Sequence, residues 1–355
     1  MNPSPPADAG TPLLPGQVRA RIAGIATHVP DRVLGNDELA ALFPEWPARK
    51  IYDKTGIRER RIAAPDETAA DLAFAAAEKM LARDPALRDE VDFLILCTQA
   101  PDYVLPTTAC VLQSRLGLRT GIGALDVNLG CSGFVYCLSL AAGLIALGAA
   151  KSVLLLTADT YSKYIHELDK SVRTLFGDGA AATLIRAADE AEGGQLGPFL
   201  FGTDGRGARD LIVETGGFRT ARSAETAVEK ADRSGNTRAP DNLYMDGARV
   251  MSFTLREVPR IYRNLLEATG SSEQDIDQVV LHQANRFMLD ALQQKLALPD
   301  DKVPRHFENI GNTVSSTIPF VLARMADDGR LAPGARFVLI GFGVGLSWAA
   351  ATVTF

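Results

Sequence analysis

Cys131 lies where a thiol could act as a nucleophile. The apolar run from Ile122 to Val127 is typical of a strand, Asn128-Leu-Gly130 breaks it, and residues 134–147 have the Leu- and Ala-rich composition of a helix. The unpaired N–H groups and the dipole at a helix N-terminus stabilise an anion, so they favour a thiolate over a thiol. Although a cysteine is more often a small buried hydrophobe, this turn makes Cys131 the candidate nucleophile.

Two further motifs carry side chains that could work with this thiol. His282-Gln-Ala-Asn285 follows an apolar run, and Asn309-Ile-Gly-Asn312-Thr lies further along the chain. Each motif alone is weak, because a histidine at a strand end is usually structural and a Gly-Asn pair is usually a turn. A cysteine with a histidine and an asparagine is nevertheless a recurring arrangement, in which a base orients the thiolate and two donors stabilise charge on a bound carbonyl.

Composition restricts the kind of protein. The content of 46% hydrophobic and 23% charged residues is ordinary for a soluble globular chain, and no apolar run approaches the ~20 residues that span a bilayer. The net charge of −6 argues against generic nucleic-acid binding. The four cysteines show no CxxC pairing, and the four histidines are scattered. We therefore expect a reduced, cytoplasmic protein without a membrane span or a metal site, in which Cys131 alone of the cysteines lies at a helix N-terminus.

The elements that must position these residues form two similar halves. Residues 1–17 carry five prolines and indicate a disordered leader. In residues 18–190, apolar runs alternate with helical segments, which is typical of a mostly parallel sheet covered by helices. Residues 191–355 open with a polar, Gly-rich stretch that we interpret as a strand or two followed by a loop at 220–241, and the alternation then restarts.

The two halves share a local pattern. Val91-Asp-Phe-Leu-Ile-Leu-Cys-Thr-Gln99 and Ile276-Asp-Gln-Val-Val-Leu-His-Gln-Ala284 each follow a helix, begin with an aliphatic-Asp pair and end in a polar tip. An internal duplication explains this similarity economically. It would place His282 at a strand end, where α/β folds hold their sites.

Several motifs in the same order as in a known family support a resemblance. The chain resembles β-ketoacyl-acyl-carrier-protein synthase III and its relatives in the thiolase superfamily, from about Val18 to Phe355. The motifs are Thr55-Gly-Ile-Arg-Glu-Arg60, Phe176-Gly-Asp-Gly179, His282-Gln-Ala-Asn285, Gly311-Asn-Thr313 and the Gly-rich turn 341–348. The resemblance implies an α/β thiolase-like fold in which duplicated halves form five layers, α-β-α-β-α, and it implies a homodimer.

The resemblance also implies roles. Cys131, His282 and Asn312 would form a catalytic triad, and the backbone N–H groups of Cys131 and Val344 would form an oxyanion hole. Cys131 would take an acyl group from a thioester and condense it with a malonyl thioester after decarboxylation, with acyl carrier protein as the partner and no metal or redox cofactor. Two alternatives stay open: transfer of the acyl group from Cys131 to a hydroxyl or amine, and a catalytically silent subunit that binds acyl carriers.

Some positions depart from the family pattern. Lys50, Lys54 and Lys170 align with the residues that hold the adenine of coenzyme A, and a lysine cannot stack as a guanidinium or an indole does. Trp46 could take over part of that stacking. We therefore expect acyl-carrier-protein thioesters to be preferred over coenzyme A thioesters. Three ammonium groups near the entrance to the substrate site would attract the acidic carrier protein.

Four other positions are expected to shape the substrate site. Leu105 stands where a bulky phenylalanine from the other subunit limits the acyl pocket in the family. Arg286 takes the place of a shifted arginine that docks the carrier protein, and Phe176 and Asn285 are expected to contact the substrate.

Overall fold

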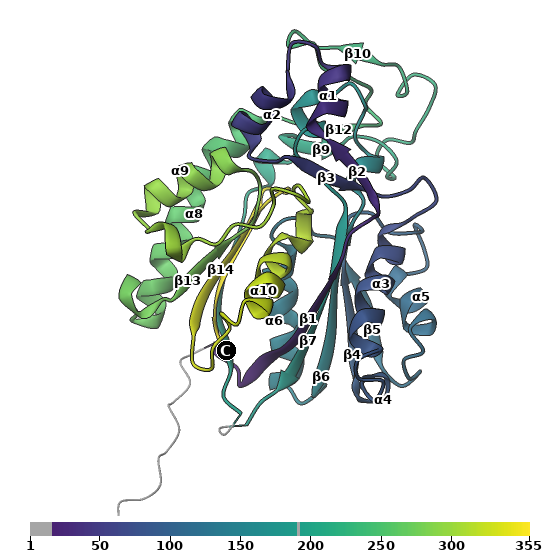
Figure 1. Cartoon of the computed structure of the whole chain (residues 1–355). Coiled ribbons are helices and arrows are strands. Elements are labelled where there is room, and N and C mark those ends of the chain that lie inside the picture. Colours follow the sequence, from purple (N-terminus) through teal and green to yellow (C-terminus); the bar gives the residue numbers. More distant parts are fainter. Residues whose placement is uncertain (1–15, 190–191) are drawn as a thin grey trace, which may run out of the picture.

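The computed structural model describes residues 16–189 and 192–355 (Figure 1). Residues 1–15 of the predicted leader lie outside the described residues. Gly16 and Gln17 are described, and they lead directly into Val18, which pairs with Leu196.

The first sheet has five strands in the order β1-β7-β6-β4-β5. Its strands are β1 (Ala20–His28), β4 (Phe93–Cys97), β5 (Gly123–Val127), β6 (Ser152–Asp159) and β7 (Gly179–Ala187). β6 lies at the centre, parallel to β4 and antiparallel to β7. All eight residues of β6 are buried, as a continuous apolar run predicts for a strand covered on both faces.

The second sheet repeats this arrangement with four strands in the order β8-β15-β14-β13. Its strands are β8 (Gln195–Thr203), β13 (Gln278–Leu281), β14 (Arg336–Gly343) and β15 (Ser347–Thr354). In both sheets successive strands among the first three are antiparallel and the fourth is parallel to the third; β5 adds a further parallel strand to the first sheet. β13 thus takes the place of β4, and these are the two strands whose sequences suggested the duplication.

Helices and sheets stack in five layers (Figure 1). The helices are α3 (Ala69–Leu81) and α5 (Thr108–Arg115) outside the first sheet, α6 (Gly133–Ala146) and α10 (Thr317–Asp327) between the sheets, and α8 (Gly247–Thr269) and α9 (Arg286–Leu296) outside the second. Because α6 is apolar on most sides, it can be covered by both sheets at once. The architecture is the thiolase-like α-β-α-β-α fold that the resemblance implied.

A cap of short elements lies at the top of Figure 1. Its helices are α1 (Asn36–Leu42) and α2 (Ala48–Thr55); its paired strands are β2 (Arg32–Gly35) with β3 (Glu59–Ile62), β9 (Leu211–Val213) with β12 (Leu243–Met245), and β10 (Lys230–Ala231) with β11 (Thr237–Arg238). The loop expected at 220–241 therefore contains a small hairpin. Two one-turn helices are α4 (Leu87–Glu90), beside α3, and α7 (Lys170–Arg173), which contacts β12.

Short 3-10 turns complete the chain. They are Tyr161–Lys163, Gly205–Gly207, Glu273–Asp275, Asp300–Lys302 and Val314–Ser316. Across the described residues, no helix combines the length and hydropathy that a membrane span requires.

Candidate active site

A cavity of about 240 Å³ brings the three candidate residues together, since Cys131, His282 and Asn312 all line it. Cys131 comes from the turn before α6, His282 directly follows β13, and Asn312 lies in the loop before α10. The remaining lining is mostly apolar: Ser171, Leu175, Phe176, Leu211, Met245, Gly247, Val250, Met251, Ala284, Asn285, Phe287, Met288, Phe342 and Gly343. One cavity thus joins a nucleophile from the first half to two polar side chains from the second.

Cys131 is almost completely buried. Its side chain is 4% exposed, and it stands two residues before the first residue of α6. Burial, followed by the nearby charge of Asp159, raises the pKa of the Cys131 thiol well above its ordinary value. Burial therefore opposes the thiolate that the helix terminus was expected to favour.

Cys110 corrects a second expectation about the cysteines. It is the third residue of α5 and is exposed, so Cys131 is not alone in lying near a helix N-terminus. What distinguishes Cys131 is the cavity that it lines.

The end of β14 lies in close contact with Cys131. A Cβ atom built on Gly343 would lie 2.9 Å from Cβ and 3.1 Å from Sγ of Cys131, and one on Gly341 would lie 2.8 Å from the Cys131 carbonyl oxygen. The absence of a side chain at Gly341 and Gly343 therefore allows the second half of the chain to approach Cys131 closely.

Replacing Gly343 with alanine should displace the thiol. We expect acylation of Cys131 to slow by about 10- to 100-fold, since a misplacement of about 1 Å has effects of that size. Gly143→Ala is the matched control on α6, where a new Cβ would meet nothing within 4 Å. It should leave acylation unchanged and stabilise the helix by about 0.5–1 kcal/mol. Acylation rates by mass spectrometry and melting temperatures check both results, and normal acylation of Gly343→Ala would contradict the prediction.

His282 is a neutral, oriented imidazole. It is 2% exposed, and burial lowers its pKa to about 3. Its Nδ1 lies 2.7 Å from the hydroxyl of Thr317, and its ring packs edge-on against Phe342 at 5.3 Å between centroids. These contacts fix the ring and leave Nε2 as the nitrogen free to act in the cavity that His282 lines.

The Asn312 side chain is held in place through its amide oxygen, Oδ1. Asn312 Oδ1 accepts a hydrogen bond from the Val314 N–H at 2.9 Å, and its backbone pairs with the loop that carries Phe176. Since Oδ1 is engaged, the Nδ2 amide hydrogens are the groups that Asn312 can offer to a ligand.

Val344 follows β14 and borders a second, larger cavity of about 740 Å³. Its side chain packs against Gly130, immediately before Cys131, and its carbonyl oxygen accepts a hydrogen bond from Ser347 Oγ at 2.8 Å. The peptide before Val344 therefore lies beside the nucleophile turn, and its role in an oxyanion hole stays a prediction.

Phe176 and Asn285 line the smaller cavity, and their contact with substrate stays a prediction. Arg286 does not match its expected role. Its guanidinium donates to the carbonyl oxygens of Tyr52 and Asp53 at 2.9 Å each, in the last turn of α2. Arg286 is thus engaged as a cap for a helix C-terminus, so the prediction that it is available to dock a carrier protein is not supported by its contacts.

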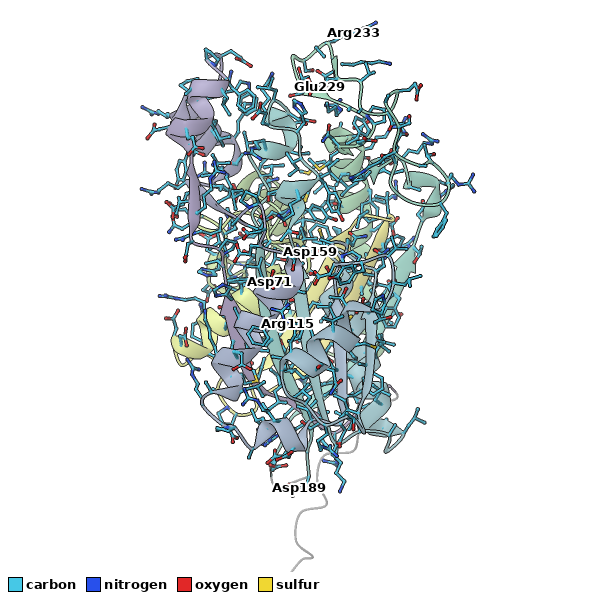
Figure 2. The ribbon with its side chains drawn as sticks, turned by 90° about the vertical axis from the view of Figure 1, so that its right-hand side faces the viewer. Asp71, Arg115, Asp159, Asp189, Glu229 and Arg233 are labelled. Carbon is cyan, nitrogen blue, oxygen red and sulfur yellow. The ribbon has the colours of Figure 1, made fainter. Side chains whose placement is uncertain are left out.

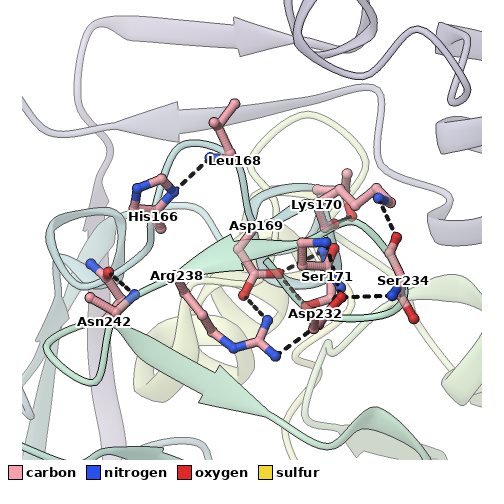
Figure 3. A network of polar contacts seen from close by, with 12 residues as sticks. His166, Leu168, Asp169, Lys170, Ser171, Asp232, Ser234, Arg238 and Asn242 are labelled. Carbon is pink, nitrogen blue, oxygen red and sulfur yellow. Dashed lines mark hydrogen bonds and ion pairs between the residues drawn. The ribbon is translucent and has the colours of Figure 1, made fainter. Parts of the chain in front are cut away.

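Lys170 also differs from expectation, as the network in Figure 3 shows. Its ammonium is buried, donates to the Ser234 carbonyl oxygen at 2.7 Å and pairs with Glu45 at 3.0 Å. The next ion pair in the network joins Arg238 to Asp169 at 2.8 Å, which fastens the β10–β11 hairpin beside α7. The charge of Lys170 is therefore paired with Glu45 inside the cap, and the ammonium does not face solvent as a free charge.

Lys50 and Lys54 do remain exposed. Their ammonium groups lie 5.2 Å and 5.6 Å from the ring centroid of Trp46, and Lys50 also donates to the Glu45 carbonyl oxygen at 3.1 Å. The three aligned lysines do converge on Glu45 and Trp46, but only two of them present their charge to solvent.

Leu105 lies on an exposed loop and is 79% exposed, while its neighbours Tyr103 and Val104 line the larger cavity. Its expected role depends on a second subunit and stays a prediction.

Sequence reasoning missed three residues that shape the site: Gly343, Thr317 and Asp159. Asp159 had a readable signal, because it ends a buried strand, where α/β folds place functional groups. Among residues 16–189 and 192–355, no group of three or more His, Cys, Asp or Glu side chains could hold a metal ion.

Two matched halves with a cysteine, a histidine and an asparagine in one cavity define the thiolase class of acyl-transferring enzymes. Comparisons with known proteins narrow this class. A family model described as 3-oxoacyl-[acyl-carrier-protein] synthase III matches residues 125–205, and one for its C-terminal part matches residues 266–355. The β-ketoacyl-[acyl-carrier-protein] synthase III of Deinococcus deserti is 36% identical over 332 residues, covering 94% of this chain and 90% of that protein.

Solved structures agree. A crystal structure of a 3-oxoacyl-(acyl-carrier-protein) synthase III is 62% identical with a TM-score of 0.92, covering 95% of this chain and all of that one. The priming β-ketosynthase of the R1128 polyketide pathway is 31% identical with a TM-score of 0.80, covering 97% and 98%. The chain therefore belongs to the β-ketoacyl-acyl-carrier-protein synthase III family of condensing enzymes.

Proposed function

We propose that Cys131 carries the acyl group in a two-step condensation. In the first step its sulfur attacks an acyl thioester, an S–acyl bond forms, and the bond to the carrier sulfur breaks. The thiol proton passes through His282 to the departing carrier thiolate. The observation that carries this proposal is the single cavity lined by Cys131, His282 and Asn312.

In the second step a malonyl thioester occupies the same cavity. Loss of CO₂ leaves an enolate, whose oxygen accepts hydrogen bonds from His282 Nε2 and Asn312 Nδ2. The enolate carbon attacks the acyl carbonyl, a carbon–carbon bond forms, and the Cys131 thiolate leaves and takes up from solvent the one proton that the overall reaction consumes. The N–H groups of Cys131 and Val344 stabilise the oxyanion that forms on the acyl group.

Thr317 allows His282 to serve both steps. Its hydroxyl lies 2.7 Å from Nδ1 and 3.2 Å from the Val314 carbonyl oxygen. When the hydroxyl donates to Val314, Nδ1 carries the proton and Nε2 can accept one from the thiol. When it donates to Nδ1, Nε2 carries the hydrogen and can donate to the enolate.

Peptide mapping tests the first step. After incubation with an acyl thioester that the enzyme turns over, the acyl adduct should be found on Cys131. Cys110 is the informative control, because it is the exposed cysteine and also lies near a helix N-terminus. An adduct on Cys97, Cys110 or Cys137 in place of Cys131 would remove the basis for the proposal.

Acyl carrier protein is the proposed donor and malonyl partner. Lys50 and Lys54 project from α2, while Arg286, at the start of α9, holds the end of that helix beside the cavity-lining Phe287. Since Lys170 is neutralised, two exposed charges should attract an acidic carrier. Trp46 is covered by both ammonium groups, which leaves the adenine of coenzyme A a poor stacking surface.

We expect carrier-protein thioesters to be preferred over coenzyme A thioesters by about 2- to 30-fold, the range for two exposed ion pairs of about 0.2–1 kcal/mol each. The preference should shrink as salt rises, because exposed charges are screened. Values of kcat/KM for one acyl group on both carriers, at low and high ionic strength, measure it. The Lys50→Ala/Lys54→Ala double variant should remove the salt dependence, whereas Lys151→Ala, which loses one exposed charge directly before β6, should not. A salt-insensitive preference for coenzyme A would contradict the prediction.

A homodimer in the cytoplasm completes the proposal. Within the described residues, β5 pairs only with β4, and the nearby loop exposes Tyr103, Val104 and Leu105. An open strand edge beside exposed apolar side chains supports pairing with a second copy. The four free cysteines support a reducing compartment. Light scattering on the purified protein measures the subunit number.

A further inference from the structure

Asp159 is a buried carboxylate at the last position of β6, near the middle of the molecule (Figure 2). It is fully buried, and burial raises its pKa to about 7. Its Oδ1 accepts a hydrogen bond from the Gln99 N–H at 2.9 Å. Its Oδ2 accepts from the Ser315 N–H at 3.3 Å and from Ser315 Oγ at 2.5 Å. A buried carboxylate with three hydrogen bonds is costly to place and therefore requires an explanation.

The turn that Asp159 holds lies against both proposed donors of the second step, His282 and Asn312. Ser315 lies in the 3-10 turn Val314–Ser316. The Val314 N–H on one side of Ser315 holds Asn312 Oδ1, and the Thr317 hydroxyl on the other side meets His282 Nδ1. A shift of this turn would therefore move Asn312 and the partner of His282 together.

The turn does not hold its shape without help. Val314 has φ of 55°, in the left-handed region that a β-branched residue rarely adopts, at a cost of about 1–3 kcal/mol. Such a conformation persists only when surrounding contacts impose it. Besides the bonds from Ser315 to Asp159, a second tether joins Ser316 Oγ to the Thr157 hydroxyl at 2.9 Å and to its carbonyl oxygen at 3.0 Å.

From these contacts we infer that Asp159 is a positioning residue, which fixes the Val314–Ser316 turn so that Asn312 and His282 face the malonyl group together. The inference rests on the roles proposed above for those two residues. Asp159 itself does not line the cavity with them, so it acts through the turn.

A merely structural role and a positioning role predict different results. The charge of Asp159 contributes to the raised pKa of the Cys131 thiol. Replacing Asp159 with asparagine removes that charge, so at a fixed pH the thiol should react at least as fast as in the wild type. Loss of the turn geometry should at the same time slow decarboxylation, which uses Asn312 and His282 together, more than acylation, which uses His282 alone. A general loss of folded structure would instead slow both.

The experiment compares the two half-reactions in Asp159→Asn. We expect malonyl decarboxylation and condensation to fall by about 10- to 100-fold, while acylation of Cys131 and its alkylation by iodoacetamide fall by less than about threefold or rise. Ser315→Ala, which removes one of the three hydrogen bonds, should shift the same ratio in the same direction by a smaller factor. The double variant should fall no further than Asp159→Asn, because both changes break one contact.

Asp178→Asn is the matched control. Asp178 is also fully buried and accepts bonds from the N–H groups of Ala63 and Ser162, at 2.8 and 3.0 Å, and from the Ser162 hydroxyl, but it lies outside the turn. It should lower the melting temperature and change the ratio of decarboxylation to acylation much less than Asp159→Asn does.

Parallel losses of both half-reactions in the Asp159 and Ser315 variants, or an unchanged ratio, would overturn the inference. If Asp159→Asn does not fold, the ratio in Ser315→Ala decides alone. The proposed function is tested separately, because it fails if His282→Ala and Asn312→Asp themselves leave decarboxylation intact.

Discussion

Asn312→Asp is expected to slow malonyl decarboxylation by about 10²–10³-fold while acylation of Cys131 stays within about threefold of the wild type. Loss of one donor to a developing oxyanion has an effect of this size. The aspartate can still accept the Val314 N–H bond through its Oδ1, so the turn keeps its shape. It loses the two amide hydrogens and adds a negative charge beside the enolate.

His282→Ala should behave differently from Asn312→Asp. Because burial raises the pKa of the Cys131 thiol, removal of the imidazole that lines the same cavity should slow acylation as well as decarboxylation. The measurements are acyl-enzyme formation by intact-protein mass spectrometry and CO₂ release from a malonyl thioester. If both variants release CO₂ at the wild-type rate, the two side chains do not stabilise the enolate and simple acyl transfer gains support.

The fold was accessible from the sequence because its strands are continuous apolar runs. β4 and β13 follow helices, begin after aliphatic-Asp pairs and end in polar tips, and the structure places them at matching positions of two sheets. The meeting of Cys131 and His282 in one cavity was predictable for the same reason, because both follow strands, whereas Asn312 lies in the loop before α10. Strand ends in an α/β fold gather at one edge, so residues that follow such strands meet in space.

The electrostatics of the site were harder to predict from the sequence, because they depend on burial and on partners far along the chain. Helix position alone suggested a thiolate at Cys131, but the second sheet covers that thiol and excludes water. Lys170 aligned with a ligand-binding position, yet Glu45 and the Ser234 carbonyl oxygen engage it from segments 125 and 64 residues away.

The charged stretch Arg49–Arg61 is a second case in which burial could not be predicted from the sequence. A run of charges usually covers a solvated surface, but Arg60 within it is fully buried. Its guanidinium donates to the Leu34 and Thr174 carbonyl oxygens and to Asn36 Oδ1, and burial lowers its pKa to about 10. The motif therefore holds the segment that leads to Phe176, a role that composition could not reveal.

Cys131→Ala should abolish condensation, with a fall of at least about 10³-fold, because loss of a nucleophile removes the covalent route altogether. It should nevertheless retain malonyl decarboxylation, since His282 and Asn312 take their positions from Thr317 and Val314 and not from the thiol. This result is the converse of Asn312→Asp, which should load the acyl group but fail to release CO₂.

Cys137→Ala is the matched control for Cys131→Ala. Cys137 lies on α6, the helix that follows Cys131, and is buried away from the cavity that Cys131 lines, so its loss should leave both half-reactions at the wild-type rate. Release of CO₂ and formation of the 3-oxoacyl product are followed in the same samples. Condensation by Cys131→Ala at a measurable fraction of the wild-type rate would show that the acyl group is carried elsewhere. Loss of CO₂ release in the same variant would show that the thiol is needed to organise the malonyl site, and the two half-reactions would then not be separable by residue.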